Sequence, residues 1–103
     1  MEKTLDHENC GVAKTLKIVG SKWTMLILHN LFEGKNRFGE IEKSLKGISP
    51  KTLSLRLTQL EKDGIIKKKV FAEVPLHVEY HLTAKGESLS KIFDQMANWG
   101  TKV

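Results

Sequence analysis

Basic and hydroxyl side chains gather in one short stretch near the middle of the chain, where their types and spacing suit a nucleic-acid partner. Lysine and arginine pair with phosphate or guanine, and serine or threonine hydroxyls reach phosphates or base edges. The candidate contacts are Ser49, Lys51, Thr52, Ser54 and Arg56. Arg56 has a second interpretation, because Glu40 or Glu42 could pair with it inside the domain.

A second basic cluster follows this stretch and would assist it. Lys67, Lys68 and Lys69 alternate between the two faces of a strand, so at most two of them point toward one phosphate track. We take these to be Lys67 and Lys69. Arg37 and His77 complete the candidate DNA contacts, although His77 could instead be an exposed turn residue and neutral histidine is a weak phosphate ligand.

The spacing of the candidate residues fits neither a catalytic site nor a metal site. His7 and Cys10 supply two ligands where a structural zinc site needs four. His77 and His81 lie about 13 Å apart along a strand, too far to chelate one ion. Because no glycine-rich phosphate loop or catalytic triad is present either, we expect no enzyme, no metal and no cofactor.

The positive charge is concentrated in the same part of the chain. Seventeen Lys and Arg against twelve Asp and Glu give a net charge of +5 over 103 residues. Residues 35–69 carry +6, whereas residues 1–34 are neutral and residues 70–103 carry −1. A basic middle segment is typical of a DNA-binding surface, although a solvated lysine-rich face has the same composition.

Size and composition exclude several classes of protein. A chain of 103 residues forms one domain, 1–103, with a single core and without a deep substrate cavity. The longest apolar candidate, 23–32, is too short and too polar to span a membrane, and the N-terminus has no apolar signal core. A single cysteine permits no intrachain disulfide, so we expect a cytoplasmic protein.

The elements that must position the candidate contacts follow from apolar periodicity. Helices are predicted over 11–19, over 21–33 with Ser21 as its cap, and over 38–46. Ser49 followed by Pro50 marks the start of a helix that ends near 63 and buries Leu53, Leu57 and Leu60. A β-hairpin is predicted over 65–82, and one last helix, capped by Thr83, over 84–100.

Two short helices with a glycine in the turn, followed by a hairpin, predict a winged helix-turn-helix. The fold class is therefore α+β and mostly α. The helix-turn-helix covers about 38–63, a two-stranded hairpin wing covers about 65–82, and extra terminal helices at about 11–19 and 84–100 flank them.

The chain resembles the HxlR-type branch of the MarR-like winged helix-turn-helix regulators from residue 10 to about 100. The segments that carry the resemblance are Cys10, GSKWTMLILHNL (20–31), RFGEIEKSL (37–45), GISPKTLSLRLTQLEKDGII (47–66), VPLHVEYHLTAKGESL (74–89) and Trp99-Gly100. Two positions depart from the family pattern. His77 stands where the family usually has arginine, and Gly11 stands where proline commonly follows the cysteine.

The resemblance implies a cytoplasmic, homodimeric regulator of transcription that binds a pseudo-palindromic operator in double-stranded DNA. The 50–62 helix would lie in the major groove, and the hairpin would be the wing. Dimerisation in this family relies mainly on the terminal helices. The apolar residues at matching positions are Val12, Leu16, Leu89, Ile92, Phe93, Met96 and Trp99. Part of this stripe would pack on the chain's own core in any case.

Cys10 matches the position at which some family members sense oxidants, quinones or aldehydes. It precedes a predicted helix whose N–H groups and dipole favour the thiolate, and a dimer would bring two such thiols. The alternative is a half-buried and unreactive cysteine. For the whole chain, the alternative to a DNA-binding regulator is a protein-interaction module whose basic face binds an acidic partner.

Overall fold

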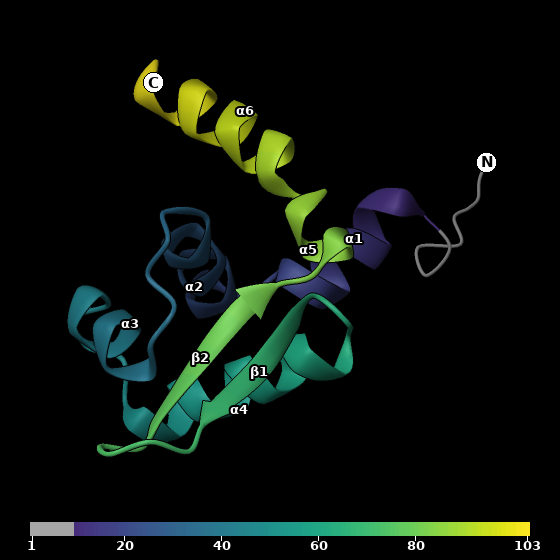
Figure 1. Cartoon of the computed structure of the whole chain (residues 1–103). Helices are drawn as coiled ribbons and strands as arrows, with labels where there is room; N and C mark the ends of the chain where they lie inside the picture. The colour runs from purple at the N-terminus through teal and green to yellow at the C-terminus, as the bar shows by residue number, and fades with distance from the viewer. Residues whose placement is uncertain (1–9) are drawn as a thin grey trace.

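The structure is a computed structural model that describes residues 10–103. Its elements follow the predicted order (Figure 1). Antiparallel strands β1 and β2 form the only sheet of the described part. This is the expected mostly helical α+β class with a two-stranded wing. The bounds are α1 (Gly11–Val19), α2 (Lys22–Phe32), α3 (Phe38–Ser44), α4 (Pro50–Lys62), β1 (Ile66–Phe71), β2 (His77–Leu82), α5 (Ala84–Glu87) and α6 (Ser90–Thr101).

Two helices begin with the same serine and threonine arrangement. Ser49 Oγ accepts the Thr52 N–H at 3.0 Å at the start of α4, and Ser21 Oγ accepts the Thr24 N–H at 3.1 Å at the start of α2. Each cap satisfies one of the backbone donors that a helix start leaves unpaired. Both predicted helix starts are confirmed.

The hydrophobic core lies where α2, α3 and α4 pack against one another and against the hairpin. Ile27 and Leu28 of α2, Ile41 of α3 and Leu53 of α4 are all fully buried. The core thereby fixes the direction in which the opposite side of α4 faces solvent. No helix of residues 10–103 has the length and apolar content that crossing a membrane requires.

The hairpin is tied to the loop before α3. Strand β1 pairs with β2 in the register Ile66 with Leu82 through Phe71 with His77. On the other edge of β2, the Tyr80 N–H donates to the Asn36 carbonyl at 2.8 Å, and Arg37 forms an isolated bridge with Glu79. The wing is therefore held against the helix-turn-helix along part of its length.

The last predicted helix is two helices. Thr83 Oγ1 accepts the Gly86 N–H as expected, but α5 ends after one turn and α6 begins at Ser90. The Ser88 hydroxyl donates to the Lys85 carbonyl, and the Leu89 N–H bonds three residues back to Gly86, which tightens this turn. Helix α6 therefore leaves the body of the domain at an angle (Figure 1).

Helix α5 packs very closely on the end of the turn before β1. A Cβ atom at Gly86 would collide with the carbonyl oxygen of Ile65. The same carbonyl oxygen accepts the Thr83 N–H, so this corner joins the hairpin to the C-terminal helices. The close approach explains why glycine stands at position 86.

Candidate nucleic-acid interface

Helix α4 presents a continuous row of side chains to solvent on the side opposite its buried leucines. Leu53, Leu57 and Leu60 are buried, and 3.6 residues per turn place positions 51, 55, 58 and 62 on the other side. These four residues, the outer row of α4, span about 16 Å at 1.5 Å per residue. The row consists of Lys51, Leu55, Thr58 and Lys62, all exposed.

The sequence-based contact list covers this row incompletely. It contains Lys51 and the exposed Ser54 at the edge of the row, but not Leu55, which the structure places at its centre. Helical spacing already puts position 55 opposite the buried stripe. Its residue type, an aliphatic side chain without a hydrogen-bonding group, kept it off a list that was built from donors.

The hydroxyls of Ser49 and Thr52 serve the start of α4. Besides accepting the Thr52 N–H, Ser49 Oγ donates its proton to Thr52 Oγ1 at 3.0 Å. The Ser49 proton is therefore used inside the helix start, whereas Thr52 accepts with its oxygen and keeps its own proton to donate. Of the two, Thr52 is the better donor toward a phosphate or base edge.

Arg56 points away from the outer row, toward α1 and α2. Its Nη1 donates to Gln59 Oε1 at 3.3 Å, and its Nε is buried without a hydrogen-bond partner. The side chain lines a hollow of about 440 Å³ that also reaches Lys17 of α1. Gln59, rather than Glu40 or Glu42, is thus its partner inside the domain.

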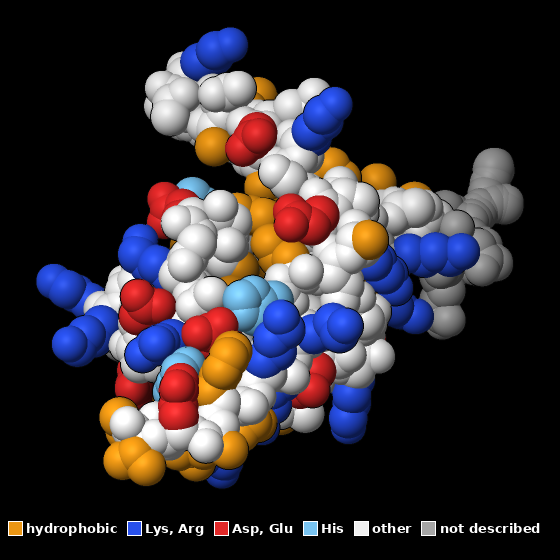
Figure 2. All heavy atoms as spheres, viewed as in Figure 1, with side chains coloured by type: hydrophobic (Ala, Val, Ile, Leu, Met, Phe, Trp, Pro, Cys, Tyr) orange, Lys and Arg blue, Asp and Glu red, His pale blue; other side chains and the backbone are white. Residues whose placement is uncertain are grey.

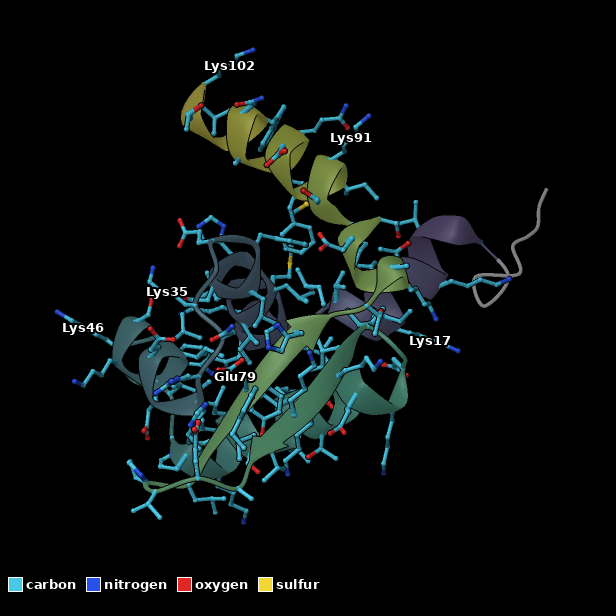
Figure 3. The ribbon with its side chains drawn as sticks, in the orientation of Figure 1. Lys17, Lys35, Lys46, Glu79, Lys91 and Lys102 are labelled. Carbon is cyan, nitrogen blue, oxygen red and sulfur yellow. The ribbon has the colours of Figure 1, made fainter. Side chains whose placement is uncertain are left out.

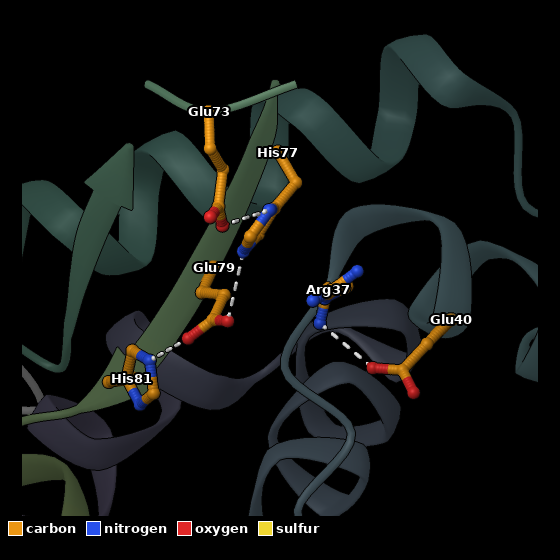
Figure 4. Close-up of polar contacts among 6 residues, drawn as sticks. All are labelled: Arg37, Glu40, Glu73, His77, Glu79 and His81. Carbon is orange, nitrogen blue, oxygen red and sulfur yellow. Dashed lines mark hydrogen bonds and ion pairs between the residues drawn. The ribbon is translucent and has the colours of Figure 1, made fainter. Parts of the chain in front are cut away.

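Arg37 lies between α3 and the wing. Its backbone N–H donates to Glu40 Oε1 at 3.2 Å at the start of α3, and its side chain is exposed (Figure 4). It lines a hollow of about 490 Å³ that Lys43 of α3 and Leu76 near the wing turn also line. Two cations therefore border this groove beside the helix-turn-helix.

The lysines of β1 divide between the faces of the hairpin as expected. Lys67 and Lys69 stand opposite His81 and Glu79, so they share the outer face, which Glu79 marks in Figure 3. Lys68 stands opposite the buried Tyr80, on the face that packs toward α4. Lys68, which is not among the predicted DNA contacts, is therefore the lysine on the side of α4.

The predicted wing contact His77 is bound inside the wing. Its Nδ1 lies 3.3 Å from Glu73 and its Nε2 lies 3.2 Å from Glu79, and its ring stacks on Phe71 with centroids 4.6 Å apart (Figure 4). The side chain is only 18% exposed. Both ring nitrogens thus have carboxylate neighbours, which leaves no nitrogen directed at a phosphate.

Glu79 contacts two histidines of its own strand, His77 and His81 of β2, and the sequence analysis did not predict these contacts. His81 Nε2 lies 2.7 Å from the second carboxylate oxygen of Glu79 (Figure 4). The hydrogen bond with His81, followed by that with His77, holds the pKa of the Glu79 carboxyl below its ordinary value, against the opposing effect of desolvation. The outer face of β2 therefore carries negative as well as positive groups.

The turn of the wing is apolar and not basic. Val74 and Leu76 are strongly exposed, with Pro75 between them. Figure 2 shows hydrophobic side chains gathered at the end of the molecule where Figure 1 places the β1–β2 turn. The main cationic groups of the candidate interface are consequently those of α4, Arg37 and β1.

Cys10 is exposed immediately before α1. The backbone N–H groups at the start of the helix, first that of Ala13 and then that of Val12, lower the pKa of its thiol. The thiolate is thus favoured, as the helix position predicted. His7, the other residue considered with Cys10 for metal binding, lies outside the described residues.

The predicted dimerisation residues fall into two groups. Leu89 and Phe93 pack on the chain's own core, and the Phe93 ring meets Phe32 edge to face with centroids 5.1 Å apart. The other five are exposed. They are Val12 and Leu16 on α1 and Ile92, Met96 and Trp99 on α6, where the last three line a hollow of about 500 Å³.

A helix-turn-helix held against a hairpin, whose second helix exposes a row with a lysine at each end, defines a winged helix-turn-helix regulator. A family model, the HxlR-like helix-turn-helix, matches residues 18–103. YdeP of Bacillus subtilis, an HTH-type transcriptional regulator, is 42% identical over 97 residues, which cover 94% of this chain and 76% of YdeP. The chain therefore belongs to the HxlR-like family, and it is a transcriptional regulator.

Similar proteins have been solved in a reduced form and after treatment with diamide. The redox regulator HypR in its reduced form has a TM-score of 0.85 and 38% identity, with 90% of this chain and 92% of that chain covered. YodB of B. subtilis, treated with diamide, has a TM-score of 0.73 and 36% identity, with 90% and 93% covered. HypR has also been solved in its oxidised form.

Proposed function

We propose that this regulator binds a pseudo-palindromic operator as a homodimer, with α4 of each protomer in the major groove of one half-site. The outer row of α4 carries this proposal. It is long enough to follow a groove, it has a lysine at each end, and its opposite side is buried in the core. We assign Arg37 and Lys68 as additional phosphate contacts, with Thr52 and Ser54 as hydroxyl donors.

Other sequence-based contacts take smaller roles in this proposal. Ser49 completes the cap of α4, Arg56 is bonded to Gln59, and His77 lies between two carboxylates. Lys67 and Lys69 share a face with Glu79, which offsets part of their charge toward a phosphate. We place these five at the edge of the interface, where they act on the structure or on the long-range field.

The dimer would form through α6, with α1 beside it. Ile92, Met96 and Trp99 leave an apolar surface on a helix that has no buried residue. A twofold axis beside this helix would cover the surface with its own copy. Two α4 helices related by that axis would then meet two half-sites of one operator.

The test is operator selection from a random pool of duplex DNA, followed by a mobility-shift titration. Lys51→Glu in the outer row should abolish the selective complex. Lys102→Glu is the matched control, because Lys102 lies at the end of α6, far from the hairpin and α3 (Figure 3). If Lys51→Glu left DNA binding intact but lost an acidic protein partner in a pull-down, the interaction-module alternative would replace this proposal.

We further propose that oxidation of Cys10 controls the regulator. In a dimer, the two Cys10 thiols would form one disulfide while an oxidant such as diamide takes up two electrons and two protons. A mixed disulfide with a small thiol is the other product open to an exposed cysteine. The lowered thiol pKa and the exposure of the sulfur support this role.

The redox proposal is tested on the selected operator. Diamide should change the operator affinity of the native chain, and a reductant should restore it. Cys10→Ser should bind DNA equally with and without diamide, and it should run as a monomer on a non-reducing denaturing gel. A Cys10→Ser variant that still responds to diamide would exclude Cys10 as the sensor.

A further inference from the structure

Leu55 is an apolar side chain at the centre of a surface that otherwise suits a polyanion. It is 53% exposed and lies one helical turn after Lys51 and one turn before Thr58. The leucines of the core lie on the opposite side of α4, so packing within the chain does not explain a leucine at this position.

The centre of the outer row offers DNA no hydrogen-bond donor of its own. Leu55 has none, and Thr58 Oγ1 donates its proton to the Ser54 carbonyl at 2.9 Å. The lysines stand at the two ends, Lys51 and Lys62. A groove that receives this row would therefore meet cations at the ends and an apolar surface between them.

Among the groups that base pairs expose in the major groove, the only alkyl group is the C5 methyl group of thymine. A leucine placed over any other base edge would take donors or acceptors out of water without replacing their hydrogen bonds. Leu55 is also the sixth residue of α4, within the N-terminal part of the helix, from which recognition helices contact bases.

We infer that Leu55 is a specificity-determining residue that selects thymine at one position of each half-site by packing on its C5 methyl group. This inference rests on the proposed operator binding. Burial of one methyl-sized group corresponds to about fourfold in affinity. A dimer that makes the contact in both half-sites would gain about fifteenfold.

The test uses the full chain and its selected operator. Each thymidine in a half-site is replaced in turn by deoxyuridine, which removes the methyl group and keeps the base pair and its hydrogen-bonding edge. The dissociation constant is then measured for the native chain and for Leu55→Ala. The native chain should lose about fourfold at one position of a half-site and about fifteenfold when both half-sites are changed.

The variants separate this inference from the proposed function. Leu55→Ala should bind the thymidine and deoxyuridine operators equally, whereas Leu76→Ala, an exposed leucine of the wing turn, should keep the native difference. Failure to select any sequence would overturn operator binding and this inference together. Selective binding without a deoxyuridine effect, or with the same effect in Leu55→Ala, would overturn the inference alone.

Discussion

Removal of the Trp99 side chain should dissociate the proposed dimer without unfolding the monomer. Trp99 is 70% exposed near the end of α6, and no residue of that helix is buried. A tryptophan can bury up to about 250 Å², so roughly 170 Å² of this side chain is available to a partner. The monomer loses no core contact when it is replaced by alanine.

The size of the effect follows from this area. If the dimer covers half of it, each Trp99 contributes about 2 kcal/mol at about 25 cal/mol per Å². The symmetric pair then contributes about 4 kcal/mol, which raises the dimer dissociation constant about a thousandfold in Trp99→Ala. A native dimer with a nanomolar dissociation constant would thus become a micromolar one.

Sedimentation equilibrium across a concentration series measures this change, and circular dichroism checks that the variant is folded. Asn98→Ala is the matched control, because it lies on the other side of α6 from Ile92 and Met96. The control should dimerise as the native chain does. A folded Trp99→Ala variant with native self-association would refute the assignment of α6 to the dimer interface.

Two further predictions concern the fold itself. Leu53→Ala should cost about 2–5 kcal/mol in the free energy of unfolding, because the side chain is fully buried between α4 and its neighbours; a loss below 1 kcal/mol in urea titration would contradict this packing. Glu79→Gln should lower stability near neutral pH. The histidine contacts depress the folded-state pKa of Glu79, so its stabilising effect is present above the ordinary value of 4.5 and is lost as the pH falls through the folded-state value. Thermal melts should therefore differ most at neutral pH and converge in acid, and a difference that grows in acid would contradict the role of the carboxylate.

The parts of the fold that could be predicted from sequence are those that depend on local chemistry. Ser49 and Pro50 define a helix start through backbone geometry and capping, and both occupy those positions. The spacing of Leu53, Leu57 and Leu60 decides which side of α4 is buried, and hence the position of the outer row. A single sequence can carry this information because each signal lies within a few residues.

The rest depends on contacts between segments. Ile65 and Ile66 are both apolar and both buried, so the pattern at the start of β1 does not show which of the following lysines lie on the core-facing side of the hairpin. The pairing of Lys68 with the buried Tyr80 assigns Lys68 to that side. The direction of Arg56 likewise depends on how α1 and α2 pack beside α4. The break before α6 could not be predicted from periodicity, because Ala84 is the only apolar side chain of α5 and the apolar stripe begins at Leu89.

The salt dependence of operator binding, measured for the native chain and for Lys51→Ala, tests whether the outer row of α4 lies on DNA. We expect a sequence-selective complex whose association constant falls steeply with salt on logarithmic axes. Loss of one phosphate contact per protomer in Lys51→Ala should reduce that slope by about 1.8 for the dimer. A native chain whose DNA binding is insensitive to salt and sequence, or a variant with an unchanged slope and affinity, would contradict the placement of the outer row of α4 on DNA.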